Sequence, residues 1–595
     1  MDFEEIYEPV ETYQKYLRAA FDRNSREAFE EIVAKSGCDE KLNAEKVRKI
    51  NALKNEIARH QSKKNTQEAL RVLAWLVAVA GFGMSFVCIL ACFQPGERHT
   101  GTHLLAAAAG LILGAAALYW IFTCLNKKIH ELAGCIRSRQ TLLDARLSEA
   151  WAQLAPLNRL YQWDTIANLI TKTVPIFKLD KYFSNARLEE LVSHFGMSGI
   201  SNQENSMLYC QSGALNGNPF LICTTKNYHM GTQDYHGSLS ISWQEEEDYT
   251  DSNGNRKTRW VTKFQTLHAT VTKPKPAYGE SRFLIYGNEA APDLEFHRHP
   301  SSFANPEGFF SSMKQGLAIS SLRRKSQQLN GFMALSNAEF DAVFGALDRN
   351  SEVQFRLLFT PLAQREMLKI LRDSKVGYGD DFKFRKNRQI NIVQPAHFRN
   401  LNISCDPGLF HHYDLAMARK VFRDYSAEYF RSFFFAFAPL LAIPLYQQHR
   451  SDLDIFREVY GSESSCWECE TIANDFGEEV FKHAESVTDN ILKVSRTGPQ
   501  VAVTAYGFRG ESRTDWVSVY GNDGHSHDVP VEWTEYLPVE RTSSMVVTET
   551  GGLNQLEFEE KLPQSQKWQE FFRAYGTTLA DVKYRRSLIA FLREN

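Results

Sequence analysis

Two apolar stretches of this chain are long enough to cross a lipid bilayer. They cover residues 72–93 and 104–125, contain no acidic or basic side chain, and are separated by the short polar loop 94–103. At about 1.5 Å per residue, a helix over either stretch is about 33 Å long, which exceeds the hydrocarbon core of a bilayer at about 30 Å. The sequence therefore predicts two antiparallel transmembrane helices that form a helical hairpin.

The charges beside these stretches predict the orientation of the hairpin. Residues 41–71 hold nine Lys and Arg against three Glu, residues 127–146 hold five against two acidic residues, and loop 94–103 has no net charge. Loops that stay in the cytoplasm carry the excess of Lys and Arg. The N-terminus lacks the basic and apolar regions of a cleaved signal peptide. We expect both termini to be cytoplasmic and the basic flanks to attract anionic lipid headgroups.

Composition fits a reducing compartment. The ten cysteines are scattered over 595 residues, and Cys88, Cys92 and Cys124 lie in the apolar stretches. This pattern is typical of free thiols, so we expect no disulfides. The formal net charge of −3 argues against a nucleic-acid partner.

The hairpin is expected to continue into a stalk. Apolar residues recur every three or four positions in segments 41–71 and 126–161, which predicts two amphipathic helices that pack as a coiled coil. Within the apolar stretches, Gly81 and Ser85 lie four residues apart, as do Gly110 and Gly114. Such small residues let two helix backbones approach closely, either inside the hairpin or between copies in a homo-oligomer. Alternatively, they only fill an apolar helix.

The rest of the chain predicts an α+β fold in several parts. We expect acidic helices at 1–40, an α+β cytoplasmic domain at 162–405, a helical region at 406–495, a β-rich block at 496–552 and C-terminal helices at 553–595. Runs of aromatic and β-branched residues predict short strands, with the following among them: 208–211, 220–224, 238–243, 260–272, 283–286, 353–359, 382–385, 389–393, 501–508, 516–520, 529–533 and 545–548. A helix is predicted at 579–592.

A third apolar stretch, residues 433–446, is too short to span a bilayer. Its fourteen residues carry no charge, and Pro439 and Pro444 interrupt it. A proline in a helix leaves a carbonyl group without its partner, which lipid cannot satisfy. We predict a buried core helix here, and a contact with the membrane surface is the alternative.

Four short motifs invite a chemical interpretation. Asp523, His525, His527 and Asp528 place imidazoles and carboxylates within six residues, which suits a divalent metal site, but a polar turn around Asn522-Asp-Gly explains the same residues. His297-Arg-His299 repeats the spacing. The lone Cys466-x-x-Cys469 lacks the second half of a zinc site and a preceding strand. Asp380 and Asp381 in Gly-Tyr-Gly-Asp-Asp precede a strand, whereas polymerases carry paired aspartates at a hairpin apex.

Several segments resemble a known family. Residues 7–13 (Tyr-Glu-Pro-Val-Glu-Thr-Tyr), the paired apolar stretches, residues 213–220 (Gly-Ala-Leu-Asn-Gly-Asn-Pro-Phe) and residues 350–362 followed by a helix resemble a family of bacterial two-pass inner-membrane proteins that is catalogued only as a domain of unknown function. The resemblance covers residues 1 to about 400. It implies a bacterial inner membrane protein, and it implies no reaction and no site residues.

Two classes of function remain open at this stage. A membrane-tethered scaffold or adaptor that binds an unidentified protein partner accounts for the stalk and the large aromatic-rich body. A metal-dependent enzyme accounts only for residues 523–528. Motifs of NTPases, α/β-hydrolases and zinc proteases do not occur in the sequence. We therefore favour the scaffold.

Overall fold

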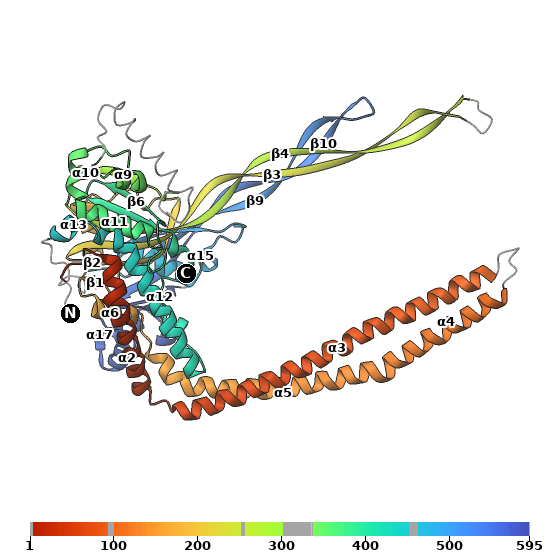
Figure 1. Cartoon of the computed structure of the whole chain (residues 1–595), viewed down its shortest axis with the longest axis horizontal. Coiled ribbons are helices and arrows are strands. Elements are labelled where there is room, and N and C mark those ends of the chain that lie inside the picture. The colour runs from red at the N-terminus through yellow and green to blue at the C-terminus, as the bar shows by residue number, and fades with distance from the viewer. Residues whose placement is uncertain are drawn as a thin grey trace. The chain divides into compact units, whose positions relative to one another are not determined.

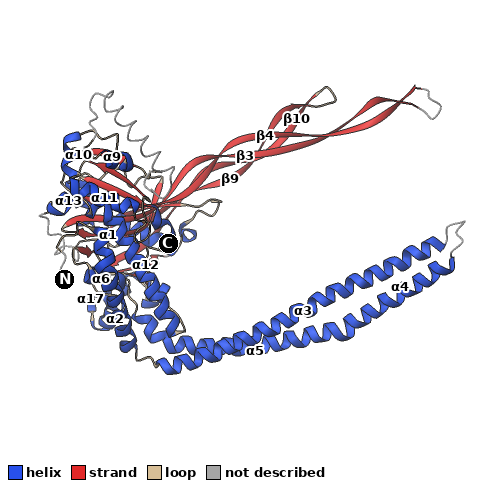
Figure 2. Ribbon diagram, in the orientation of Figure 1, coloured by secondary structure: helices blue, strands red, loops and turns tan. Residues whose placement is uncertain are grey.

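The computed structural model describes residues 4–92, 100–250, 256–301, 335, 337–451 and 462–593, so most of loop 94–103 lies outside the described part. Its helices and two antiparallel sheets confirm the α+β class (Figure 2). The chain divides into two units. We call residues 27–161 and 407–424 the helical unit, and residues 1–26, 162–406 and 425–595 the sheet unit.

The helical unit is a long hairpin of two antiparallel arms. Helix α3 (Glu40–Cys92) is one arm, and α4 (Thr100–Trp120), the π-helical turn η2 (Ile121–Leu125) and α5 (Asn126–Leu160) follow one another in the other (Figure 1). The predicted stalk and membrane segments are therefore continuous. Ile50, Leu143 and Ala150 form the core of the stalk, which confirms its amphipathic pattern.

The seven-stranded sheet of the sheet unit has the order β1-β2-β3-β4-β7-β6-β5. All its neighbouring strands are antiparallel. Its strands are β1 (Phe177–Leu179), β2 (Asn205–Leu215), β3 (Asn218–Thr250), β4 (Arg256–Gly287), β5 (Glu295–Arg298), β6 (Phe382–Asn387) and β7 (Ile390–Pro395). The five-stranded sheet has the order β11-β12-β10-β9-β8, with β8 (Ile491–Thr497), β9 (Gln500–Tyr520), β10 (Ser526–Glu549), β11 (Lys583–Arg585) and β12 (Leu588–Arg593).

Helices surround the two sheets. Those of the sheet unit are α1 (Pro9–Thr12), η1 (Tyr13–Leu17), α6 (Thr165–Thr173), α7 (Asn185–Glu189), η3 (Glu190–His194), α9 (Ala338–Phe344), α10 (Glu352–Leu358), α11 (Pro361–Arg372), η4 (Ala396–Asn400), α13 (Pro444–Gln448), α14 (Cys466–Phe476), α15 (Glu478–Phe481), α16 (Gln555–Lys561), η7 (Leu562–Gln564), α17 (Gln566–Tyr575) and η8 (Leu579–Asp581). Helices α2 (Arg18–Ser36) and α12 (Leu415–Leu441) contribute residues to both units, and η5 (Pro407–Phe410) belongs to the helical unit.

Two β-hairpins extend far beyond the sheets that hold their bases. Strands β3 and β4 have 33 and 32 residues, and β9 and β10 have 21 and 24. Strand β3 pairs with β2 only up to Asn227, and β4 pairs with β7 only from Leu284. We call residues 228–250, 256–283, 507–520 and 526–543 the β-arm; its two hairpins project together from the sheets (Figure 1).

The two hairpins of the β-arm pack face to face. Leu267, Ala269, Val529 and Val531 form the buried core between them. A methyl group at Gly237 would lie 2.1 Å from the carbonyl oxygen of Pro530, so this contact requires a glycine. The predicted pairs of short strands are therefore single long strands. The sequence suggested breaks because the strands contain glycine and proline, but proline is tolerated where one edge of a strand has no neighbour.

The Phe-rich segment is a core helix of the sheet unit, as predicted. Phe433 and Phe437 in α12 pack against Phe177 and Phe220, with ring centroids 4.9–6.3 Å apart, and all four side chains are buried. Pro439 lies inside α12, and α13 begins at Pro444. This finding excludes the alternative of a membrane contact for these phenylalanines, because the protein interior already covers them.

Two predicted elements are wrong. Residues 353–358 of the predicted strand 353–359 are helical, in α10, because Ser351 caps the helix by accepting a hydrogen bond from the Gln354 amide, and Phe355 and Leu358 share its buried face. Residues 579–592 do not form a helix but η8, β11 and β12, so the C-terminal region is not wholly helical. Strand β12 pairs with β10, and residues 588–591 are buried on both faces. A short, continuously apolar run shows no periodicity in its sequence that would distinguish a strand from a helix.

Candidate functional site

The four predicted helix-packing residues lie at the contact of α3 with α4. A methyl group at Gly110 would lie 2.6 Å from the carbonyl oxygen of Gly81, and one at Gly114 would lie 2.9 Å from the Phe82 ring. The Ser85 hydroxyl donates to the carbonyl oxygens of Gly81 (2.9 Å) and Ala107 (2.8 Å). These residues close the hairpin within one chain, so they are not free to pack against a second copy.

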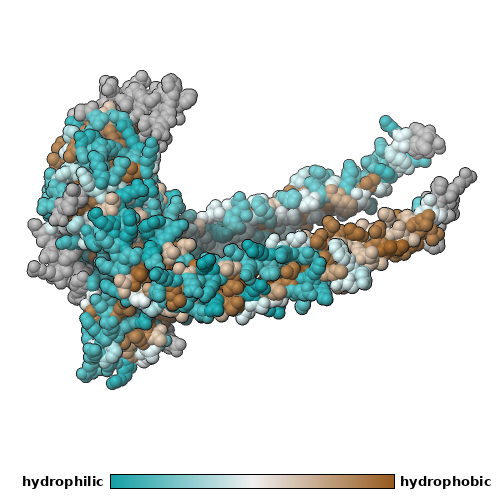
Figure 3. Space-filling view, turned by 60° about the horizontal axis from the view of Figure 1, so that its bottom comes forward, coloured by the Kyte–Doolittle hydropathy of each residue, from teal (hydrophilic) through white to brown (hydrophobic). Residues whose placement is uncertain are grey.

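The outer surface of the same hairpin is apolar and exposed. Among the residues that the structure describes, two helices are long and apolar enough to cross a membrane, and only 22% and 28% of the residues in their most apolar windows are buried. Twenty large apolar side chains of the described residues between 72 and 122 are exposed to the surroundings. Figure 3 shows the resulting hydrophobic surface over the end of the hairpin. A core helix of a soluble protein would be mostly buried, and these helices are not.

The predicted metal residues lie at the tip of the β9–β10 hairpin. The His527 ring is 2.8 Å from the Asp523 carboxylate, and the His525 backbone N–H donates to the same carboxylate (3.1 Å). The His525 backbone N–H and the His527 side chain together hold the pKa of Asp523 below its usual value. Among the residues that the structure describes, no group of three or more His, Cys, Asp or Glu side chains is arranged to hold a metal ion. A divalent metal at Asp523, His525 and His527 stays a prediction.

Side chains of the other acidic and histidine motifs form ion pairs or hydrogen bonds with residues of the same chain. Asp380 forms an ion pair with the buried Arg298 guanidinium and accepts from the Ser301 amide (2.7 Å). Asp381 instead binds His397. The two carboxylates are thus held apart by different partners, before β6 as the sequence indicated. His297 lies on the edge strand β5, where its ring is 2.7 Å from Asp348.

Cys466 and Cys469 of the Cys-x-x-Cys motif are poorly suited to redox chemistry. They occupy the first turn of α14, which is capped by the Ser465 hydroxyl. Burial raises the pKa of Cys466 and raises that of Cys469 to about 12. Because the thiolate is the reactive form, both thiols are weak nucleophiles at neutral pH.

A cavity of about 590 Å³ lies at the base of the β-arm, and the sequence did not reveal it. Its aromatic wall combines Tyr228 and Tyr278, which face each other in the β3–β4 register, with Phe508 and Tyr506 from β9. Pro538 lies opposite Phe508 in the β9–β10 register. The lining is completed by Gln203, Glu204, Ile491, Gly507, Val539 and Glu540. We call this cavity the aromatic pocket.

The rings of the aromatic pocket form a continuous row. The centroids of Tyr228 and Tyr278 are 6.1 Å apart, and those of Tyr228 and Phe508 are 5.6 Å apart. Lys226 lies over the Tyr278 ring, 5.5 Å from its centroid. Burial is the largest cause that raises the pKa of Tyr278, so its hydroxyl stays protonated and can donate.

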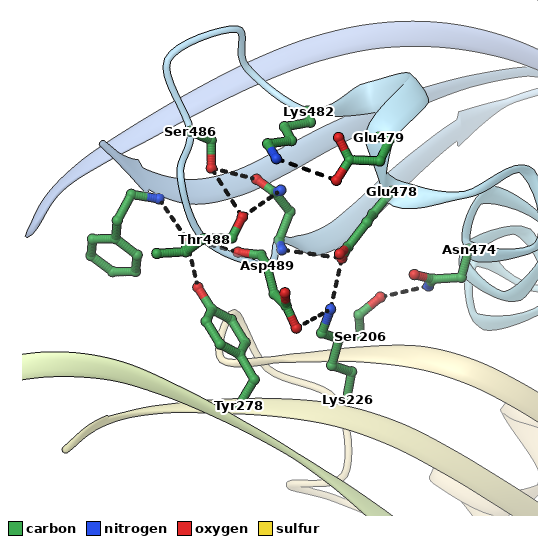
Figure 4. Close-up of polar contacts among 12 residues, drawn as sticks. Ser206, Lys226, Tyr278, Asn474, Glu478, Glu479, Lys482, Ser486, Thr488 and Asp489 are labelled. Carbon is green, nitrogen blue, oxygen red and sulfur yellow. Dashed lines mark hydrogen bonds and ion pairs between the residues drawn. The ribbon is translucent and has the colours of Figure 1, made fainter. Parts of the chain in front are cut away.

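A network of polar contacts behind the pocket fixes this wall (Figure 4). The Tyr278 hydroxyl donates to Thr488 Oγ1 (3.2 Å), which also accepts from the Phe508 amide (3.1 Å). Lys226 Nζ lies 2.7 Å from the Glu478 carboxylate and 3.1 Å from Asp489. The loop that carries Thr488 and Asp489 is thereby fastened to both hairpins.

The pocket is lined by aromatic rings and a few polar groups. Among the described residues that line it, the polar groups are tyrosine hydroxyls, one glutamine amide and the carboxylates of Glu204 and Glu540. Sequence reasoning noted the aromatic strands but could not bring together rings that lie far apart along the chain.

Comparison with known proteins gives no assignment: no family model, no curated protein and no solved structure matches the chain. The resemblance to a bacterial two-pass family stays a prediction.

Proposed function

We propose that this protein is a membrane-anchored scaffold or adaptor, held by the α3–α4 hairpin in the cytoplasmic membrane of a bacterium with both termini in the cytoplasm. The observation that carries this proposal is the exposed apolar surface of residues 72–122. Exposure of a large apolar side chain to water costs about 1.5–3 kcal/mol, so twenty of them cost on the order of tens of kcal/mol. Lipid removes this cost.

The charge distribution supports the orientation. The basic residues of segments 41–71 and 127–146 lie on the side of the hairpin that continues into the stalk. An excess of Lys and Arg favours the cytoplasmic side. Residues 1–26 of the sheet unit precede the first stalk helix and the rest follows the second, so both parts lie on this cytoplasmic side.

The β-arm supports a role in binding a partner protein. Trp260, Phe264, Trp516 and Tyr520 expose about two thirds or more of their surface on its strands. Aromatic side chains are enriched in protein interfaces because they bury a large area with few rotatable bonds. An isolated pair of long strands also offers unpaired backbone edges, which favour association with another chain.

We also propose that the anchor self-associates through the outward faces of its helices. Gly110 and Gly114 are already used inside the hairpin. A homo-oligomer would therefore use the exposed side chains of α3 and α4, such as Leu76, Val79 and Ile112. Light scattering of the purified protein in detergent tests this idea, and a strict monomer at micromolar concentration would remove it.

Fusion reporters test the anchor and its orientation. Alkaline phosphatase, which is active only outside the cytoplasm, should be active when inserted at residue 98 and inactive when fused after residue 595. A green fluorescent protein fusion should show the opposite pattern. If the C-terminal phosphatase is active, the charge argument is wrong, and if alkaline carbonate extracts the protein from membranes, the anchor is wrong.

A further inference from the structure

We propose that the aromatic pocket binds a proline-containing, basic segment of a partner protein in the extended polyproline II conformation. This inference rests on the proposed scaffold function, because it names the partner that the scaffold would recruit. Nothing in the motifs of the sequence pointed to it. Three properties of the pocket carry it: a row of aromatic rings, an acidic rim and a wall that is fixed before binding.

The aromatic row matches the surface of a polyproline II helix. Tyr278, Tyr228 and Phe508 form consecutive ring contacts at 5.6–6.1 Å, and Tyr506 exposes more than a third of its surface beside them. Flat rings side by side accept successive pyrrolidine rings, and aromatic-lined grooves are the general means by which proteins bind proline-rich segments. A polyproline II helix also has no internal hydrogen bonds, so its carbonyl groups can accept from the hydroxyls of Tyr228 and Tyr506, whereas the Tyr278 hydroxyl already donates to Thr488.

The charge of the rim favours a basic ligand. The carboxylates of Glu204 and Glu540 line the pocket. Two neighbouring cations have acidic partners, because Lys226 binds Glu478 and Asp489, and Arg509 lies 3.0 Å from Glu511. Arg541, beside Glu540, donates to the Lys482 carbonyl oxygen (3.1 Å), and the five carboxylates named here outnumber these three cations. The net field at the rim is therefore negative, and an Arg or Lys of the ligand would be attracted to it.

The wall is rigid, which lowers the cost of binding. Ser486 and Asn490 approach β9 so closely that a methyl group at Gly507 would lie 2.3 Å from a polar atom of each. Tyr278 and Phe508 share Thr488 as an acceptor. A site that is already ordered loses little conformational freedom on binding, and a polyproline II segment is ordered beforehand as well.

Peptide binding to the full chain in detergent tests the inference. The probes are three fluorescein-labelled nonapeptides: three repeats of Arg-Pro-Pro, three repeats of Glu-Pro-Pro and three repeats of Arg-Gly-Ser. Fluorescence anisotropy should show saturable binding of the Arg-Pro-Pro peptide, and binding at least tenfold weaker for each of the other two. Equal binding of the Arg-Gly-Ser peptide would indicate a plain cation site and overturn the inference, as would no binding of any peptide.

Two variants and two controls locate the binding. Tyr506→Ala and Glu540→Lys should each weaken binding of the Arg-Pro-Pro peptide at least tenfold, and both side chains are exposed enough to be replaced without unfolding the arm. Tyr520→Ala and Glu532→Lys are the matched controls on the same strands outside the pocket, and they should leave binding unchanged. Equal loss in the controls would overturn the inference. A failure of the anchor in the fusion assay would leave these affinities unaltered, so the two proposals fail separately.

Discussion

Replacement of Gly110 by leucine should open the α3–α4 hairpin. A β-carbon at this position would lie 2.4 Å from Ser85 Oγ and 2.6 Å from the Gly81 carbonyl oxygen, whereas ordinary contacts are 3.4–4 Å. The helices must separate by about 1 Å, which costs about 1–3 kcal/mol for overpacking. Loss of the Ser85 hydrogen bond to Ala107 adds about 0.6 kcal/mol, the average for such bonds in a membrane. We expect a total loss of about 2–4 kcal/mol.

The assay is an SDS titration in mixed micelles. Energy transfer between a dye on α3 and a dye on α5, both placed in the stalk, reports whether the hairpin is closed. Gly83→Leu is the matched control, because a β-carbon at Gly83 meets no atom within 4 Å. Both variants gain the same helix propensity, so the difference between their transition midpoints isolates the packing at Gly110.

Two results would contradict this reasoning. If Gly110→Leu and Gly83→Leu open at the same SDS fraction, the glycines do not set the distance between the helices. If Gly110→Leu leaves the hairpin closed but changes the size of the particle in light scattering, Gly110 lies between copies and not within one chain.

Three further predictions concern the sheet unit. Phe437→Ala should lower the free energy of unfolding by about 3–5 kcal/mol, because it empties a fully buried site, whereas Val353→Ala at an exposed position should change it by less than about 0.5 kcal/mol; chemical denaturation compares them. Burial lowers the pKa of Lys386 from 10.5 to about 7, so between these values the unfolded state binds more protons at this side chain, and Lys386 contributes a gain in stability with rising pH of up to about 5 kcal/mol. Buried cysteines with raised pKa values, such as Cys405 and Cys469, contribute the opposite trend, so the test compares the free energy of unfolding of the wild type with that of Lys386→Met from pH 6 to 11; a difference that does not change with pH would refute the assignment. In the folded protein at pH 7.5, iodoacetamide should modify the exposed Cys135 at least about tenfold faster than Cys469, whose pKa is about 12, as peptide mass spectrometry would show; equal rates would contradict the burial of Cys469.

The helical unit could be predicted from local sequence. Its sequence signals each extend over only one or two helical turns. They are the uninterrupted apolar runs, the spacing of apolar residues such as Ile50, Leu143 and Ala150, and the small residues Gly81 and Gly110. Helices satisfy their backbone hydrogen bonds within the segment, so such patterns are sufficient to define them. The buried helix at 433–446 was predictable for the same reason, since its length and two prolines exclude a membrane span.

The sheet unit depended on contacts that the sequence does not display locally. Strands β11 and β12 replaced the predicted C-terminal helix because β10 offered an edge for β12. Residues 353–358 became part of a helix because Phe355 and Leu358 share one buried face. Propensity is a weak guide where tertiary partners decide. The predicted short strands merged because glycine and proline do not end a strand that has one free edge.

The sequence by itself determined the long apolar helical hairpin and the mixed α+β class. Only the tertiary structure decided that four strands form a β-arm and that an aromatic pocket lies at its base. Tyr228 and Tyr278 are neighbours because the β3–β4 register pairs them, and Phe508 and Pro538 because the β9–β10 register does. A shift of one residue in either register would turn these side chains to the opposite face. The pocket therefore exists only when the pairing of both long hairpins is fixed, which no local pattern records.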